Sequence, residues 1–266
     1  SNGTISGTPT AISPSTSYEV TATNAGGSGN ATVTIEVNDV QPYAITYSGN
    51  PYTLTKGITM SANTPTSSGG AVESWSISPQ LPAGLSFSTS NGEISGTPTV
   101  LSTTTTYTVY ANNTGGSATT TVDITINDVI PSSINYAGSP FTLTKGTTMV
   151  SATPTSAGGT VVSWSITPSL PNGLSFDTST GEISGTPSTI SSSINYTVTA
   201  TNTGGIATTT VEIIINDAAP IIGYSPNSIT LVKDILMSQA NPTSGGGSVV
   251  SWSISPNLPA GLSFST

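Results

Sequence analysis

A repeat with a period of about 89 residues organises this sequence of 266 residues. The tryptophans mark it most clearly, because Trp75, Trp164 and Trp252 stand 89 and 88 positions apart. The sequence TLTKG at 53–57 recurs at 142–146, and a weaker third copy follows. A fixed period of this kind indicates a tandem array of similar structural units. Each unit must therefore fold within a single period.

Asparagine–aspartate pairs, each closely followed by a proline, divide the repeats into modules. Proline ends a strand and stiffens a joint. We expect complete modules at 40–128 and 129–217, the C-terminal part of a module at 1–39, and the N-terminal part of another at 218–266. The two partial modules are in phase, so the chain looks like a piece of a longer periodic array. The alternative is that neighbouring chains complete each other's modules by strand exchange.

Alternation of apolar and polar residues predicts β-strands throughout the modules. In the first complete module the chain reverses at 113–116, between runs whose apolar members are Tyr107, Val109, Ala111, Val122, Ile124 and Ile126. The same hairpin recurs with the apolar members Tyr18, Val20, Ala22, Val33, Ile35 and Val37, and again with Tyr196, Val198, Ala200, Val211, Ile213 and Ile215. Each hairpin is predicted to have one buried face and one threonine face.

The remaining elements of a module are short. A central strand is predicted around Trp164, and a short hairpin is predicted at 173–185 with its turn at Thr180–Gly181. About seven short strands without any helical period are typical of an immunoglobulin-like sandwich. We therefore predict an all-β protein of tandem immunoglobulin-like β-sandwich modules in an extended array, with the tryptophans in the cores.

Charge and composition exclude several classes of function. The formal net charge is −9, from 12 acidic and 3 basic residues, so no basic surface is available to neutralise phosphates. We expect neither nucleic-acid binding nor membrane insertion of this segment, because no apolar run is long enough to span a bilayer. There is no histidine or cysteine. No unique polar cluster occurs outside the copied positions, so we expect no enzyme activity.

One stretch of the sequence resembles a known family. The residues that carry the resemblance are Leu170, Pro171, Gly173, Leu174, Phe176, Gly181, Ile183, Gly185, Thr186 and Pro187. They resemble the putative-Ig repeats of large bacterial surface adhesins, which are related to cadherin-like and dystroglycan-type modules. The resemblance implies an extracellular location, at the cell surface or secreted, and a use in spacing and adhesion.

Acidic residues recur at the module junctions, which are similar to the calcium-binding linkers of cadherins. A calcium site at the joints would draw its ligands from Asp39, Asp128, Asp217, Glu93, Asp177 and Glu182. Calcium prefers six to eight oxygen ligands, many of them carboxylates. The competing interpretation is that each asparagine–aspartate pair simply ends a strand and turns the chain. No other cofactor is expected.

The lysines occupy one repeated position, so they are copies of a single site. We expect Lys56 to lie near Asp128, and Lys145 near Asp217, as exposed ion pairs at one end of each module. A second hypothesis is a lysine–asparagine isopeptide crosslink of the kind found in some adhesins with this fold. It would join Lys56 to Asn127 and Lys145 to Asn216, and its chemistry requires a buried lysine.

These features together predict a structural repeat segment of an extracellular stalk, adhesin or filament that acts as a spacer and load-bearing rod. Its expected partners are further copies of the repeat, with neighbouring chains as the alternative. A second hypothesis is that the modules themselves bind a surface glycan or protein. Sugar stacking on the tryptophans is disfavoured, because each tryptophan alternates with serines on a central strand.

Overall fold

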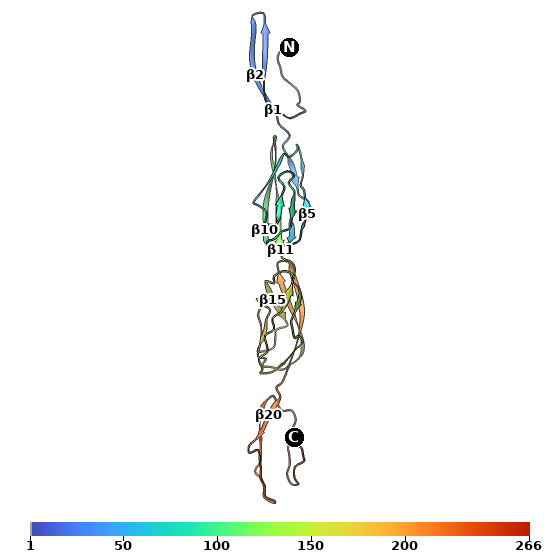
Figure 1. Ribbon diagram of the computed structural model, residues 1–266, viewed down its shortest axis with the longest axis vertical. Coiled ribbons are helices and arrows are strands. Elements are labelled where there is room, and N and C mark those ends of the chain that lie inside the picture. The colour runs from blue at the N-terminus through green and yellow to red at the C-terminus, as the bar shows by residue number, and fades with distance from the viewer. Residues whose placement is uncertain (1) are drawn as a thin grey trace. The chain divides into compact units, whose positions relative to one another are not determined.

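The computed structural model describes residues 2–266, and every regular element among them is a strand. None of the described residues belongs to a helix that could cross a lipid bilayer. Two compact units are present, Ser1–Val129 and Ile130–Thr266. Each unit contains one complete module, visible in Figure 1 around β10 and β11 in the first unit and around β15 in the second.

Residues 40–128 form nine strands, two more than the alternation predicted. They are β3 (Tyr43–Thr46), β4 (Tyr52–Thr55), β5 (Met60–Asn63), β6 (Thr66–Ser68), β7 (Ser74–Ser78), β8 (Leu85–Phe87), β9 (Ile94–Gly96), β10 (Ser102–Asn113) and β11 (Gly116–Asn127). Six of the nine are only three or four residues long. Strands this short contain too few alternating positions to be recognised from sequence alone.

A four-stranded sheet in the order β4-β11-β10-β7 forms one side of this module. The predicted hairpin is confirmed, since β10 pairs antiparallel with β11 and Asn113 lies opposite Gly116. Strand β4 pairs in parallel with β11, which places Thr55 opposite Asn127. The other strands form the sheets β5-β9-β8 and β3-β6.

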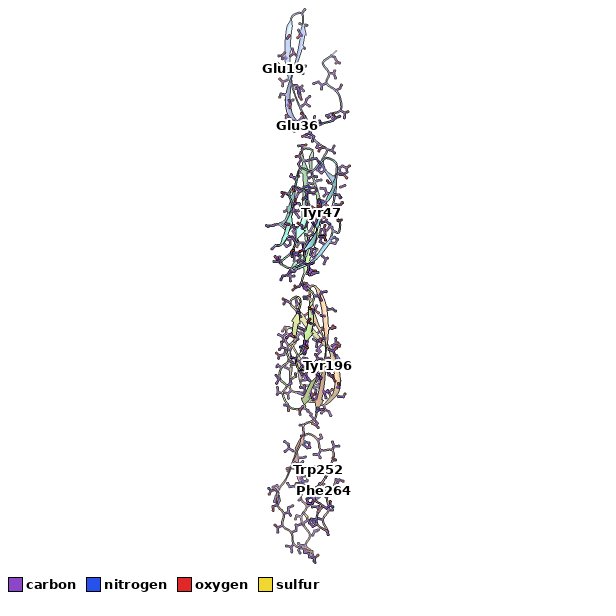
Figure 2. All side chains as sticks on the ribbon, turned by 45° about the vertical axis from the view of Figure 1, so that its right-hand side comes forward. Glu19, Glu36, Tyr47, Tyr196, Trp252 and Phe264 are labelled. Carbon is purple, nitrogen blue, oxygen red and sulfur yellow. The ribbon has the colours of Figure 1, made fainter. Side chains whose placement is uncertain are left out.

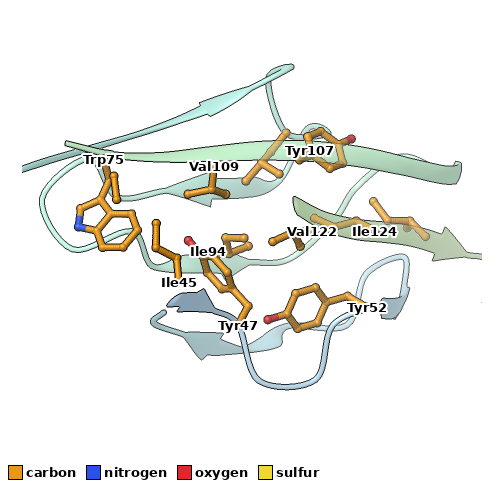
Figure 3. Packing of buried hydrophobic residues seen from close by; sticks show 12 residues of the cluster. Ile45, Tyr47, Tyr52, Trp75, Ile94, Tyr107, Val109, Val122 and Ile124 are labelled. Carbon is orange, nitrogen blue, oxygen red and sulfur yellow. The ribbon is translucent and has the colours of Figure 1, made fainter. Parts of the chain in front are cut away.

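The core lies between these sheets and centres on Ile94, which is fully buried. Trp75 and Val109 point from the four-stranded sheet toward Ile45 and Tyr47 (Figure 3). The predicted inward residues of the hairpin are at most 3% exposed. The tryptophan prediction is also confirmed, because Trp75 is 6% exposed and packs in this core.

Residues 129–217 repeat the arrangement with eight strands. They are β12 (Ser132–Asn135), β13 (Phe141–Thr144), β14 (Thr155–Ala157), β15 (Ser163–Thr167), β16 (Leu174–Phe176), β17 (Ile183–Gly185), β18 (Ser191–Asn202) and β19 (Gly205–Asn216). The main sheet has the order β13-β19-β18-β15. The predicted short hairpin is confirmed as β16 and β17, and Ala152 forms a single bridge to Ile183 where the first module has β5.

The second core has the same centre, with Ile183 fully buried and Trp164 7% exposed. Figure 2 labels one core tyrosine of each complete module, Tyr47 and Tyr196. Tandem immunoglobulin-like β-sandwich modules are therefore the fold of this chain, as the sequence predicts.

The partial modules depart from the prediction in two respects. The predicted core position is wrong for Trp252, which is only half-buried and lies outside any strand, because too few segments pack around it. Strands β1 (Ser13–Asn24) and β2 (Gly27–Val37) form the expected hairpin, and β20 (Pro220–Tyr224) pairs with β21 (Pro242–Gly246). However, Tyr18 is 48% exposed and Val20 is 39% exposed. The prediction of a buried face is wrong here, because among residues 2–266 no second sheet packs on this hairpin as one does on β10–β11.

Candidate functional site

The repeated lysine lies at the end of the parallel strand pair. The backbone N–H of Lys56 donates to the backbone oxygen of Asn127 at 2.8 Å, and Lys145 donates in the same way to Asn216 at 2.9 Å. The next residues, Gly57 and Gly146, are held by Pro98 and Pro187 through further backbone hydrogen bonds. The lysine and asparagine of the crosslink hypothesis are thus neighbours through a backbone hydrogen bond.

The lysine side chains themselves point into solvent. Lys56 and Lys145 are both exposed, whereas isopeptide chemistry needs a buried amine. In the third copy, Lys233 Nζ lies 3.8 Å from Asp234 Oδ2, and both side chains are more than four-fifths exposed. An ion pair this exposed contributes about 0–1 kcal/mol. The crosslink and the pairs with Asp128 and Asp217 stay predictions.

The three junction aspartates share one local arrangement. Oδ1 of Asp39 accepts a hydrogen bond from the N–H of Val40 at 2.7 Å. Oδ1 of Asp128 and of Asp217 accept from the next residue in the same way, at 2.9 and 3.0 Å. Such bonds fix the chain as it leaves a strand, which is the turn role of the competing interpretation.

The other acidic candidates lie in the short hairpins. The backbone oxygens of Glu93 and Glu182 accept the hydrogen bonds that close these hairpins, at 2.9 Å each. Asp177 Oδ1 accepts from the Ser179 hydroxyl at 2.5 Å and from the N–H groups of Ser179 and Thr180 at 2.7 and 3.2 Å. These hydrogen bonds, that of the Ser179 hydroxyl first, lower the pKa of Asp177.

Metal binding needs several such groups together. Among residues 2–266, no three acidic side chains gather in a cluster that could hold a metal ion. The structure therefore places the six predicted ligands without bringing three of them to one point. Calcium at the joints stays a prediction.

The structure reveals a junction feature that the sequence analysis missed. Residues 39–41 lie in a socket made by two loops of the following module, one at 69–70 and the other at 113–117. We call these loops the junction socket. The N–H of Asp39 donates to the Thr114 hydroxyl at 3.0 Å, and the backbone oxygen of Val40 accepts from Gly70 N–H at 3.0 Å.

Side-chain amides complete the junction socket. Nδ2 of Asn113 donates to the backbone oxygen of Val40 at 2.8 Å, while its Oδ1 accepts from Gly115 N–H at 2.9 Å. In return, Nε2 of Gln41 donates to the backbone oxygen of Ser117 at 2.5 Å. The linker is thus fixed to the module that follows it by hydrogen bonds along its whole length.

Glycine is required where the linker touches the socket. A Cβ atom on Gly115 would lie 2.0 Å from the backbone oxygen of Asp39, and one on Gly70 would lie 2.4 Å from that of Val40. At the last junction, a Cβ on Gly247 would lie 1.8 Å from the backbone oxygen of Ala218, and Ser248 N–H donates to Asp217 Oδ2 at 3.1 Å. The repeated Gly-Gly pairs in the sequence were the signal that could have revealed the socket.

Comparison with known families gives two adjoining matches. A model of the family described as "Putative Ig domain" matches residues 39–127 and again residues 124–216. The first match begins at the aspartate that the junction socket holds.

Among curated proteins, this chain is similar to the "Serine-rich adhesin for platelets" of Staphylococcus aureus, with 30% identity over 202 residues. That alignment covers 73% of this chain and 8% of the adhesin. The adhesin of the same name from strain MRSA252 is also 30% identical, and 14% of it is covered. The chain thus spans only a small part of the length of the curated relatives it matches.

Among solved structures, this chain is similar to an I-band fragment of titin, with a TM-score of 0.42 and 15% identity. That likeness covers 76% of this chain and 75% of the titin fragment. Extracellular domains 3–5 of Drosophila OTK give a TM-score of 0.42 and 14% identity, over 76% of this chain and 71% of that one.

Proposed function

Because this chain belongs to the Putative Ig domain family, in two adjoining copies, we propose that it is a structural segment of a cell-surface adhesin. In this proposal the modules lie outside the cell and act as a spacer that transmits load. The tethered junction is the observation that carries it. A spacer needs joints that resist bending, and residues 39–41 are held by the following module instead of forming a free linker.

Two further features support the same role. The complete modules are copies with the same buried centre, which suits a property that adds up along a chain, such as length. The curated relatives are named as adhesins, which supports a location at the cell surface. Partners of the whole protein follow from this proposal: further copies of the repeat along the chain, and a surface glycan or protein.

Joint stiffness can be measured directly, because the chain has no cysteine to interfere with labelling. We would attach nitroxides to Thr23→Cys and Ser90→Cys, two exposed positions on either side of the first junction, and measure the distance distribution by pulsed electron resonance. A narrow distribution is expected for the parent chain. Gly115→Ala is expected to broaden it, since the new Cβ collides with Asp39.

Gly29→Ala serves as the matched control, because a Cβ there meets no atom within 4 Å. A parent distribution already as broad as that of Gly115→Ala would overturn the spacer proposal. The same samples measured with calcium and with a chelator also test the calcium prediction: a width that changes between them would support a metal at the joint.

A further inference from the structure

Tyr110 is an aromatic side chain on the outer face of the main sheet of residues 40–128. Its neighbours along β10, Val109 and Ala111, are fully buried, so strand alternation directs Tyr110 away from the core. It is 37% exposed. Strand β10 is central in this part of the sheet, and Tyr110 lies opposite Thr119 of β11 and Ser76 of β7. The ring is therefore flanked by hydroxyl groups on both sides.

Further polar side chains surround the ring along the strands. Thr108 and Asn112 stand two residues before and after Tyr110 and share its face. We call Tyr110, Ser76, Thr108, Asn112 and Thr119 the Tyr110 patch. None of its members carries a formal charge.

The hydrogen-bonding groups of the Tyr110 patch are available to a ligand. Elsewhere on this face the side chains pair with one another, as Thr104 does with Thr125 at 2.8 Å and Thr106 does with Asp123 at 2.6 Å. In contrast, the side chains of the Tyr110 patch make no hydrogen bond to any of residues 2–266 in the structure. Their donors and acceptors can therefore exchange water for a ligand without breaking an internal bond.

We propose that the Tyr110 patch binds a neutral saccharide. The apolar face of a sugar ring would stack on Tyr110, and its hydroxyls would bond to the flanking threonine, serine and asparagine side chains. Tyrosine suits this role because it offers an apolar body with a polar end. The net charge of −9 disfavours anionic glycans, whereas a neutral sugar meets no such repulsion. This inference goes beyond the spacer role and does not depend on it.

The second complete module provides an internal control. Thr199 stands at the matching position of β18, between the fully buried Val198 and Ala200, and lies opposite Thr208 and Ser165. The hydroxyl surroundings are therefore retained while the aromatic ring is missing. The hairpin β1–β2 has Thr21 there. Binding is accordingly expected on residues 40–128 alone.

The test is a nuclear magnetic resonance titration of the isotope-labelled full chain with neutral hexasaccharides of glucose, mannose and N-acetylglucosamine. At least one probe is expected to shift amide signals of β7, β10 and β11 with a dissociation constant on the order of 1 mM, or about −4 kcal/mol. Adding 0.5 M salt should leave this constant unchanged within twofold, because the patch is uncharged.

Exchanging the two matching residues gives paired variants that keep the fold, since each residue already occurs at this position. Tyr110→Thr should weaken binding at least tenfold, and Tyr110→Phe should weaken it less. Thr199→Tyr should add a second set of shifts on β15, β18 and β19. The proposal is overturned if no probe shifts these signals, or if Tyr110→Thr binds as well as the parent chain.

Discussion

In residues 40–128 the hydroxyl of Tyr52 donates to the backbone oxygen of Ser48 at 2.9 Å, whereas the matching Phe141 of residues 129–217 has no hydroxyl. Asn63 Nδ2 donates to the same oxygen at 2.7 Å and to the Ser48 hydroxyl at 3.0 Å. Its counterpart is Ala152, and that of Ser48 is Ala137. We call Ser48, Tyr52 and Asn63 the polar cluster.

All three residues of the polar cluster differ between the two complete modules. Tyr52 is buried and Asn63 is half-buried, and both donate hydrogen bonds to Ser48. A polar group removed from water loses stability without its partner, which explains why the three residues are replaced together by phenylalanine and two alanines. The large buried residues around them stay the same, including the tryptophan, the central isoleucine and the tyrosine whose hydroxyl bonds to a turn glycine. The shared core therefore specifies the fold, and the polar cluster is an addition to one copy.

The largest expected effect is on the stability of the core that the two complete modules share. Trp75→Ala and Trp164→Ala should each destabilise their own module by about 3–5 kcal/mol, because each removes a large buried side chain. The free energy of unfolding of each module can be followed in urea through the methyl signals of Ile94 and Ile183. Losses in the free energy of unfolding that differ by more than about 1 kcal/mol would contradict the conclusion that the two modules share one core.

A smaller effect is expected from transplanting part of the polar cluster. Ala152→Asn alone should destabilise residues 129–217 by about 1–3 kcal/mol, because it buries an amide beside Phe141 and Ala137. Adding Phe141→Tyr and Ala137→Ser should recover part of that loss. The same urea titration measures both. Full additivity of the three changes would show that the polar cluster is not a unit.

Alkaline pH should weaken both modules through one tyrosine that they share. Burial raises the pKa values of Tyr47 and Tyr136, so the neutral phenol is favoured in the folded state. This contribution is complete below the ordinary tyrosine pKa of about 10 and is lost as the pH rises toward the folded pKa. Between pH 8 and 11 each module should lose about 1 kcal/mol from this group. Urea unfolding at both pH values checks this, and Tyr47→Phe should reduce the loss in the first module only.

The smallest effect concerns Asp177, which stands where the first module has Ser88. Its pKa is lowered in the folded state, so its contribution is present above the ordinary aspartate pKa of about 3.9 and is lost as the pH falls through the lowered folded pKa. Asp177→Ser should make the acid response of the second module resemble that of the first. Unfolding curves at pH 7 and pH 2.5 measure the difference, and an unchanged acid response would contradict the prediction.

The features predictable from sequence are those with a repeated local pattern. Alternation around Val109 and Val198 correctly predicted the long hairpins and their buried faces, and the spacing of the tryptophans predicted the modules. The parallel pairing of β4 with β11 was missed, because nothing in a four-residue strand indicates which distant strand it will join.

The junction socket and the exposure of the partial modules could not be predicted from the sequence, because both depend on contacts between distant segments. The socket joins segments far apart in the sequence, 75 residues in the case of Asp39 and Thr114, so no local pattern reveals the contact. The exposure of Tyr18 depends on which other segments pack on the hairpin, and that is a tertiary property. The repeat predicted that the lysines occupy one recurring position. Which groups a lysine side chain meets depends on tertiary contacts that the alternation does not specify.

The junction socket also bears on how such a chain can grow. A duplicated stretch covering residues 39–127 contains both the linker and the loops that hold it. Each new copy therefore includes all the residues that fix its own linker. Genetic duplication or loss of whole repeats would therefore change the number of modules without requiring any compensating mutation. Length can thus vary between related genes while every joint is preserved.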